Sequence, residues 1–380
     1  MKLHRRSGPQ TKNVLIVSAS NMGNVGDDIV SRVAGAIFMS TGNFAIKFAD
    51  LEFHRAEVEW ADIVCLGGGG LLYDRDVSGA NVDNYLRFLD HARLMGKKTV
   101  MLGVGTQGIA TNYAKRRYRE TLSLVDLVTV RDITDAVTLS EIGVSCPIYT
   151  TRDLAFLFPQ LLPLMRKEYG YQQSEALRRI IDLKNSGNKQ LLGITLSSDG
   201  IVSNRTSDIE GALYDQQKIS FLKKVVRSNS QYMPVFLTHS RDDVEFYEKI
   251  CKEKEFTSAK IIRLNDPNEC LDILDIHRQF DLVITSRLHS FIMTILAERP
   301  VLVPMQDARF DENKIVRLQR EFLPSYANNF AKLSEVGKLD VKKLGKLLSV
   351  TEMQKNEVNT TIVHANETIE YVKSFLLGSE

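Results

Sequence analysis

The feature that most constrains the fold is a repeated alternation of short apolar runs with longer helical segments. Each run is rich in Val, Ile and Leu, has the length of a buried strand, and is followed by a helix before the next run, at a spacing of roughly 25–35 residues. The clearest runs cover residues 13–20, 61–66, 98–103, 126–130, 191–196, 234–237, 282–284 and 301–303. This alternation predicts parallel βαβ units, and therefore a doubly wound α/β fold.

The runs form two successive sets, and the chain of 380 residues is long enough for two domains with sizeable cores. We expect an N-terminal Rossmann-like domain over 1–165 and a C-terminal Rossmann-like domain over 190–335. A linker containing a helix is expected over 166–189, and an amphipathic helical tail over 336–380.

The composition excludes several classes of protein. With 43% hydrophobic and 25% charged residues, the chain has the profile of a soluble globular protein. Its formal net charge of +2 gives no overall field that would attract nucleic acid. A basic N-terminus without a following apolar segment is not a secretory signal, and no apolar window is long enough to span a membrane. Four widely spaced cysteines fit reduced thiols in a cytoplasmic protein, without a disulfide framework or a zinc site.

The turn after the predicted strand 282–284 combines a fixed positive charge with a titratable imidazole. Arg287 and His289 lie between Ser286 and Ser290, and an apolar helix follows. In an open α/β sheet, ligands bind at the carboxyl ends of strands, where the next helix presents free N–H groups to an anion. The turn therefore predicts a site for an anionic substrate. The alternative is structural, with Arg287 in a salt bridge and His289 capping the helix.

Two glycine-containing loops follow strands of the first half. In the loop over 21–28 the glycine spacing is not that of a dinucleotide site, and its acidic residues would repel a pyrophosphate. Asn24 and Asp27 suit a sugar hydroxyl better, although a capped turn would explain them equally. The run Gly67 to Gly70 lets backbone approach a ligand or another backbone closely. We take Gly68, Gly69 and Gly70, with Gln107 after a later strand, as substrate-binding candidates.

Two more polar side chains lie at predicted strand ends. Arg131 follows the strand over 126–130 and is a second candidate anion ligand, unless Asp132 or Asp135 pairs with it. His239 follows the strand over 234–237, where a lone histidine is most often structural.

These segments together resemble the polysaccharide pyruvyl transferase family. The resemblance rests on motifs at 23–28, 67–72, 103–105, 130–132, 151–156 and 286–290, in one order over most of the chain. It implies two Rossmann-like domains in a glycosyltransferase-B-like arrangement, with the site between them. It also implies transfer of a pyruvyl group from phosphoenolpyruvate onto two hydroxyls of a sugar, giving a cyclic ketal on a cell-surface polysaccharide or its lipid-linked precursor.

The chemistry assigns roles to the candidate residues. Arg287 and Arg131 suit the phosphate and carboxylate of phosphoenolpyruvate, because a planar guanidinium can contact such anions with two donors. His289 is the expected general acid and base, with Asp27 or His239 as a second proton carrier. No metal or other cofactor is expected. The expected partners are phosphoenolpyruvate and a sugar acceptor, with peripheral contact to the inner face of the membrane and homo-oligomer formation left open.

Two other functions remain open at this stage. One is a nucleotide-sugar glycosyltransferase or a sugar-nucleotide epimerase of the same layout, which also needs basic residues for a diphosphate. The other is a sugar- or phosphate-binding protein without catalytic activity.

Overall fold

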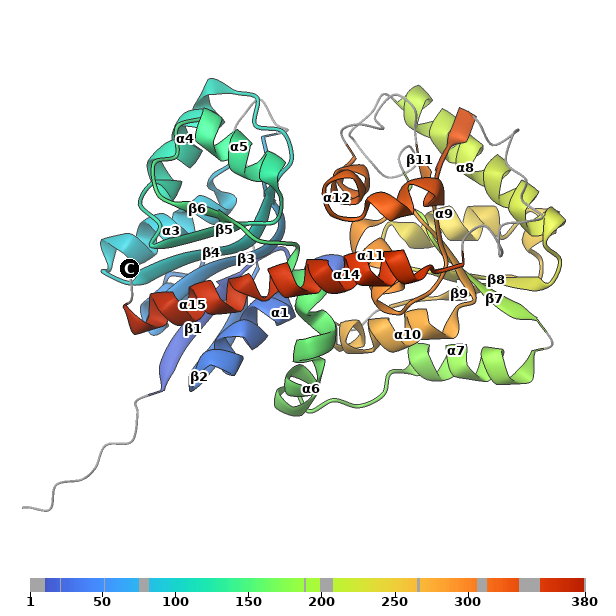
Figure 1. Ribbon diagram of the computed structural model, residues 1–380, viewed down its shortest axis with the longest axis horizontal. Helices are drawn as coiled ribbons and strands as arrows, with labels where there is room; N and C mark the ends of the chain where they lie inside the picture. The colour runs from blue at the N-terminus through green and yellow to red at the C-terminus, as the bar shows by residue number, and fades with distance from the viewer. Residues whose placement is uncertain are drawn as a thin grey trace, which may run out of the picture. The chain divides into compact units, whose positions relative to one another are not determined.

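The computed structural model describes residues 11–20, 22–50, 52–74, 82–187, 189–198, 208–264, 267–305, 313–334 and 349–378. The contacts divide the chain into two compact units, coloured from blue to red along the chain in Figure 1. Unit 1 contains residues 1–22, 27–169 and 362–380, and unit 2 contains residues 23–26 and 170–361.

Unit 1 is built on a sheet of six parallel strands in the order β2-β1-β3-β4-β5-β6. Its strands are β1 (Lys12–Val17), β2 (Phe44–Ala49), β3 (Ile63–Leu72), β4 (Lys98–Thr106), β5 (Leu127–Val130) and β6 (Ile148–Thr150). The order reverses direction between β1 and β3, which is the point where doubly wound sheets open a crevice at their carboxyl edge.

Helices flank the sheet of unit 1. They are α1 (Val25–Thr41), α2 (Arg55–Trp60), α3 (Asp83–Leu94), α4 (Asn112–Leu122), α5 (Ile133–Glu141), α6 (Phe158–Glu168) and α15 (Glu367–Leu377), with a 3-10 turn at Leu154–Leu157. Helix α15 comes from the end of the chain, and its Tyr371 stacks on Tyr149 of β6 with ring centroids 4.3 Å apart. The helical tail expected after residue 335 thus supplies an element of unit 1, and its described part begins at residue 349.

Unit 2 has a second sheet of six parallel strands in the order β12-β11-β10-β7-β8-β9. Its strands are β7 (Gln190–Thr195), β8 (Tyr232–Leu237), β9 (Lys260–Ile262), β10 (Leu282–Thr285), β11 (Val301–Met305) and β12 (Phe330–Lys332). The order reverses between β7 and β10, so the crevice of this sheet is expected where those two strands end.

The helices of unit 2 come from the segments between these strands. They are α7 (Glu175–Ser186), α8 (Asp208–Ser228), α9 (Asp243–Ile250), α10 (Ile273–Gln279), α11 (Leu288–Leu296), α12 (Lys314–Phe322) and most of α14 (Glu352–Ala365), with 3-10 turns at Lys254–Phe256, Pro267–Asp272 and Pro324–Asn329. The inner strands of both sheets are almost entirely buried, as expected for parallel sheets covered on both faces, whereas the edge strands β2, β6, β9 and β12 are partly exposed.

The interval 166–189, expected to be a linker containing a helix, holds the end of α6 and the whole of α7. Helix α6 ends at Glu168, and α7 buries Ala176, Leu177 and Ile180. Asp272 accepts hydrogen bonds from the Tyr171 hydroxyl at 2.5 Å and the Ser174 N–H at 2.7 Å. The division between the two units falls between residues 169 and 170, so α7 is an element of unit 2.

Two further findings concern the described residues alone. None of the described helices is long and apolar enough to cross a bilayer. Within the same residues, no group of three or more His, Cys, Asp or Glu side chains is arranged to hold a metal ion.

Candidate functional site

The turn between β10 and α11 lies at the point where the sheet of unit 2 reverses direction. Strand β10 ends at Thr285, and Arg287 is the N-cap residue of α11, with the extended dihedral angles φ −107° and ψ 128°. The Thr285 hydroxyl accepts a hydrogen bond from the Arg287 N–H at 3.0 Å, which closes the turn. The apolar run from Phe291 to Ile295 is buried and anchors the helix. The turn therefore presents its polar side chains at the carboxyl edge.

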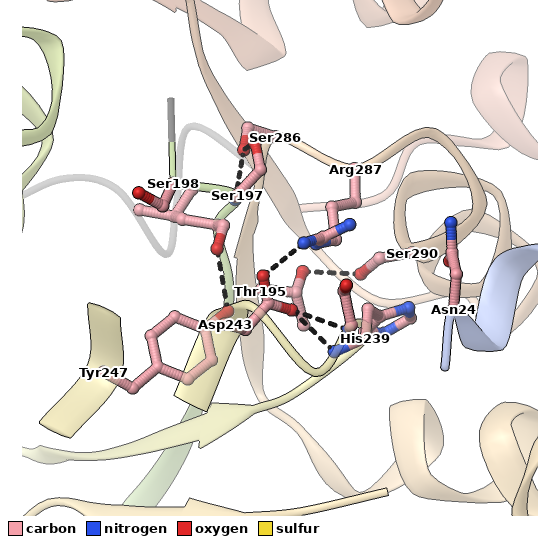
Figure 2. A network of polar contacts seen from close by, with 12 residues as sticks. Asn24, Thr195, Ser197, Ser198, His239, Asp243, Tyr247, Ser286, Arg287 and Ser290 are labelled. Atoms are coloured by element: carbon pink, nitrogen blue, oxygen red, sulfur yellow. Dashed lines mark hydrogen bonds and ion pairs between the residues drawn. The ribbon is translucent and has the colours of Figure 1, made fainter. Parts of the chain in front are cut away.

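Arg287 is held by a carboxylate from another strand–helix connection (Figure 2). Its Nη2 forms an ion pair with Oδ1 of Asp243, which is fully buried at the start of α9. Oδ2 of Asp243 accepts hydrogen bonds from the backbone N–H groups of His239 at 2.8 Å and Ser240 at 2.9 Å. Burial alone would lower the pKa of Arg287, but the Asp243 carboxylate raises it above its ordinary value. The guanidinium is therefore charged and fixed in orientation.

One donor of the Arg287 guanidinium is unpaired within the part of the chain that the structure describes. Its side chain is 18% exposed, and its buried Nε has no hydrogen-bond partner among the described residues. An unpaired buried donor on a charged group is costly unless a ligand or water completes it. The charge and partial exposure of its side chain make Arg287 a candidate anion ligand.

The serines on either side of Arg287 connect β10 and α11 to β7. Ser286 Oγ accepts a hydrogen bond from the Ser197 N–H at 2.9 Å, and Ser290 Oγ lies 2.6 Å from Thr195 Oγ1. Ser290 is fully buried. Both hydroxyls thus join the two strands at the switch point, which keeps the turn rigid.

Two buried histidines lie behind this turn in unit 2. His239 follows β8, and His277 lies on α10, with ring centroids 6.0 Å apart. Neither Nε2 atom has a hydrogen-bond partner within the described part of the chain. Burial lowers the pKa of His239 well below its ordinary value, with smaller contributions from His277, Arg287 and His289. Burial also lowers the pKa of His277, to about 3. Both rings are neutral at neutral pH.

The loop after β1 contributes residues 23–26 to unit 2. The Val25 N–H donates to the carbonyl of His239 at 2.9 Å, and the Arg241 N–H donates to the carbonyl of Gly23 at 3.1 Å. Asn24 forms an isolated antiparallel bridge with Ser240. The loop therefore belongs to the same edge as Arg287, and Figure 2 shows Asn24 beside that network.

The candidates of unit 1 form a separate set. Arg131 is almost fully buried and pairs through Nε with Asp135 at 3.1 Å and with Asp132 at 3.7 Å. Burial would lower the pKa of Arg131, but Asp135, Asp132 and Asp153 together raise it. Its guanidinium also packs so close to Gly105 that a Cβ atom there would overlap it. Arg131 thus has the carboxylate partners, Asp132 and Asp135, that the sequence analysis gave as the alternative to an anion ligand.

The four glycines continue the strand that the sequence predicted to end at Leu66. Strand β3 runs through them to Leu72, and Gly68 and Gly69 have φ of 72° and 87°. A Cβ atom at Gly68 would lie 2.5 Å from Cβ of Val30, and one at Gly69 would lie 3.3 Å from Asp27 Oδ1. The glycines therefore allow α1 to approach the strand closely. Close packing of one backbone element on another was one of the two explanations that the sequence offered for the glycine run.

Gln107 is joined to the last of these glycines. Its Nε2 donates to the carbonyl of Gly70, and its backbone N–H donates to the carbonyl of Leu72 at 2.8 Å. The structure thus brings together Asp27, Gly68, Gly69, Gly70 and Gln107 within unit 1.

Two residues at the edge of unit 2 were not singled out from the sequence. Asp243 holds Arg287, and its only signal was its place in an acidic stretch after His239. Lys218 of α8 is buried and donates from Nζ to the carbonyl of Ser197 at 2.6 Å, with Asp215 Oδ1 at 3.6 Å. Nothing in the periodicity of α8 distinguishes this lysine from a surface residue.

Comparisons with known proteins agree with the fold and indicate a family. A family model described as polysaccharide pyruvyl transferase matches residues 24–303. No curated protein sequence matches the chain significantly. A structure of S. aureus MnaA with UDP is similar over 97% of this chain and 98% of that chain, at 11% identity and a TM-score of 0.60. The UDP-GlcNAc 2-epimerase from Neisseria meningitidis bound to UDP-GlcNAc is similar over 96% of this chain and 100% of that chain, at 10% identity and a TM-score of 0.55.

At such low identity these likenesses concern the fold alone. The predicted fold class, two doubly wound parallel α/β units of the glycosyltransferase-B type, is confirmed by the two sheets and by the coverage of both chains.

Proposed function

The chain belongs to the polysaccharide pyruvyl transferase family, and from this premise we propose that it transfers the pyruvyl group of phosphoenolpyruvate to two hydroxyls of a sugar. The product is a cyclic pyruvate ketal in cell-surface polysaccharide biosynthesis. The observation that supports this most directly is the turn after β10. It joins an oriented arginine, whose Nε has no partner among the described residues, to a half-buried histidine at the point where the sheet of unit 2 reverses.

The donor brings two anionic groups, a phosphate and a carboxylate. We assign Arg287 to one of them, because its side chain is partly exposed and its guanidinium is charged and held in place, and the N-terminal N–H groups of α11 to the other. The ion pair with Asp243 prevents the guanidinium from turning away when the donor is absent. Arg131, with its carboxylate partners in unit 1, contributes by shaping the edge of that unit.

The proton balance of ketal formation requires two transfers. Each attacking hydroxyl loses one proton; one proton ends on the donor's methylene carbon, which becomes a methyl group, and the other leaves with phosphate. His289 lies two residues from Arg287 and is assigned the first transfer. His239 is one candidate for the second transfer; burial lowers its pKa, so it would pass that proton on without retaining it. Asp27 of unit 1 is the other candidate for that second transfer.

The reaction also sets requirements for cofactors and for the acceptor. The reaction needs no redox step and no electron sink, so the proposal includes no metal or other cofactor. The acceptor is a sugar with two suitably placed hydroxyls. A lipid-linked acceptor would place the enzyme at the inner face of the membrane, in the cytoplasm.

The test is to incubate the purified protein with phosphoenolpyruvate and a panel of sugar acceptors. The expected result is release of inorganic phosphate, with a ketal methyl signal in the proton NMR spectrum of the product. His289→Ala should lose turnover while retaining thermal stabilisation by phosphoenolpyruvate. If phosphoenolpyruvate neither stabilises the protein nor releases phosphate with any acceptor, the proposal fails. Release of a nucleoside diphosphate from a parallel panel of nucleotide sugars would favour a glycosyltransferase or an epimerase instead.

A further inference from the structure

Gly26 packs directly against the imidazole of His289. A Cβ atom at position 26 would lie 2.8 Å from Cγ of His289 and 3.1 Å from its Cβ, and closer still to Nδ1. Non-bonded carbon atoms normally approach to about 3.5 Å, so an added methyl group and the present position of the ring exclude each other. Both residues belong to unit 2.

The backbone of this glycine is fixed from both sides. Asn24 Oδ1 accepts a hydrogen bond from the Gly26 N–H at 3.0 Å. The preceding Val25 N–H is bonded to the carbonyl of His239, and Gly23 is bonded to Arg241. After Gly26 the chain continues as helix α1. Because these bonds hold the segment, a clash at position 26 would be relieved by movement of the imidazole.

The local conformation gives no other reason for glycine at this position. Gly26 is absent from the glycines with positive φ, so its dihedral angles are open to any residue. It lies in the first turn of a helix, where alanine is favoured over glycine. The contact with His289 is therefore the feature of the described structure that requires a residue without a side chain.

We propose that Gly26 is a positioning residue, which sets the orientation of the His289 ring relative to Arg287. The effect of Gly26 on turnover rests on the proposed function, in which His289 carries the proton. The effect of Gly26 on the orientation of the His289 ring is independent of that function. The loop over 23–26 thus serves the proton-transfer site of unit 2, through its backbone.

The kinetic test compares two alanine variants of the same helix. Gly26→Ala should lower kcat by at least about tenfold, since misplacing a catalytic group by about 1 Å can cost 10²-fold, while KM for phosphoenolpyruvate changes less than about threefold. Gly35→Ala is the matched control, because it adds the same methyl group to α1 against the ends of the Phe48, Ile46 and Tyr169 side chains, 3.0–3.3 Å away, which need to shift by only a few tenths of an ångström. It should keep the activity of the wild type. A Gly26→Ala variant with wild-type kcat would overturn the proposal.

A second measurement does not require turnover. With histidine labelled at Cε1, the signal of His289 is identified by its loss in His289→Ala. That signal should shift in Gly26→Ala but not in Gly35→Ala, with the exposed His54 as an internal reference. An unchanged His289 signal in Gly26→Ala would refute the positioning role, even if activity falls. If the wild type shows no turnover of phosphoenolpyruvate, the proposed function fails and this measurement still decides the role of Gly26.

Discussion

The two units place an arginine at the same kind of position, directly after a parallel strand, and use it differently. Arg131 of unit 1 follows β5, is 4% exposed, and has three carboxylates around it. Arg287 of unit 2 follows β10, is 18% exposed, and pairs with Asp243. Strand position alone therefore does not identify an anion site. Arg131 Nη2 and Arg287 Nε both lack a hydrogen-bond partner among the described residues, so the two arginines differ in their exposure and in the number of carboxylates around them.

The largest expected effect is on the stability of unit 1. Arg131→Ala should lower the free energy of unfolding by about 3–5 kcal/mol, because it leaves Asp132, Asp135 and Asp153 buried without their shared cation. The single tryptophan, Trp60, lies in unit 1, so urea unfolding followed by its fluorescence reports this unit. Arg55→Ala, at an exposed pair on α2, is the control and should change little. If the urea unfolding transition of Arg131→Ala is the same as that of the wild type, Arg131 does not stabilise unit 1 and the proposed difference between the two arginines is wrong.

The next largest effect is expected on the use of phosphoenolpyruvate as the pyruvyl donor. Arg287→Ala should lower kcat/KM for phosphoenolpyruvate by about 10²–10³, the usual cost of removing a preorganised donor to a charged group. Arg287→Lys should recover little of it, because an ammonium group cannot contact Asp243 and the donor with one planar fork. Stability should fall less than in Arg131→Ala, since Asp243 keeps its two backbone donors. Wild-type donor kinetics in Arg287→Ala would show that both arginines are structural.

The smallest effect concerns the buried His277 of unit 2. Thr294 Oγ1 donates to the carbonyl of Ser290 at 2.7 Å, so His277 Nδ1, 2.9 Å away, must be the donor to that hydroxyl. A second proton would go to Nε2, which has no partner in the described residues. Because the folded-state pKa of about 3 lies below the ordinary 6.5, unfolding takes up a proton below pH 6.5. Stability should therefore be full above pH 6.5 and fall as the pH decreases.

The measurement compares unfolding at two pH values. For this one histidine the free energy of unfolding should fall by about 1.4 kcal/mol per pH unit, or by about 2 kcal/mol between pH 6.5 and 5. His277→Gln should remove that part of the pH dependence when urea unfolding is followed by circular dichroism. The Trp60 transition of unit 1 serves as the internal control. An identical pH dependence in the variant and the wild type would contradict the assignment.

Much of the fold follows from the sequence, because buried parallel strands are short apolar runs that are recognisable without their neighbours. The strand over 282–284 and the helix after it were predicted in this way and lie close to β10 and α11. The end of β3 was predicted wrongly. Glycines usually interrupt a strand, but here the close packing of α1 on the glycine run requires them and the strand continues.

By itself, the sequence determined the two doubly wound units, the family, and the turn with Arg287 and His289. Only the tertiary structure decided what surrounds those side chains. Asp243 lies 44 residues from Arg287 along the chain, and Gly26 comes from the first helix, yet each fixes one of the two groups. Periodicity shows which residues are buried, because burial depends on local pattern. It does not show which buried charges form pairs, because that depends on which strands are neighbours in the folded sheet.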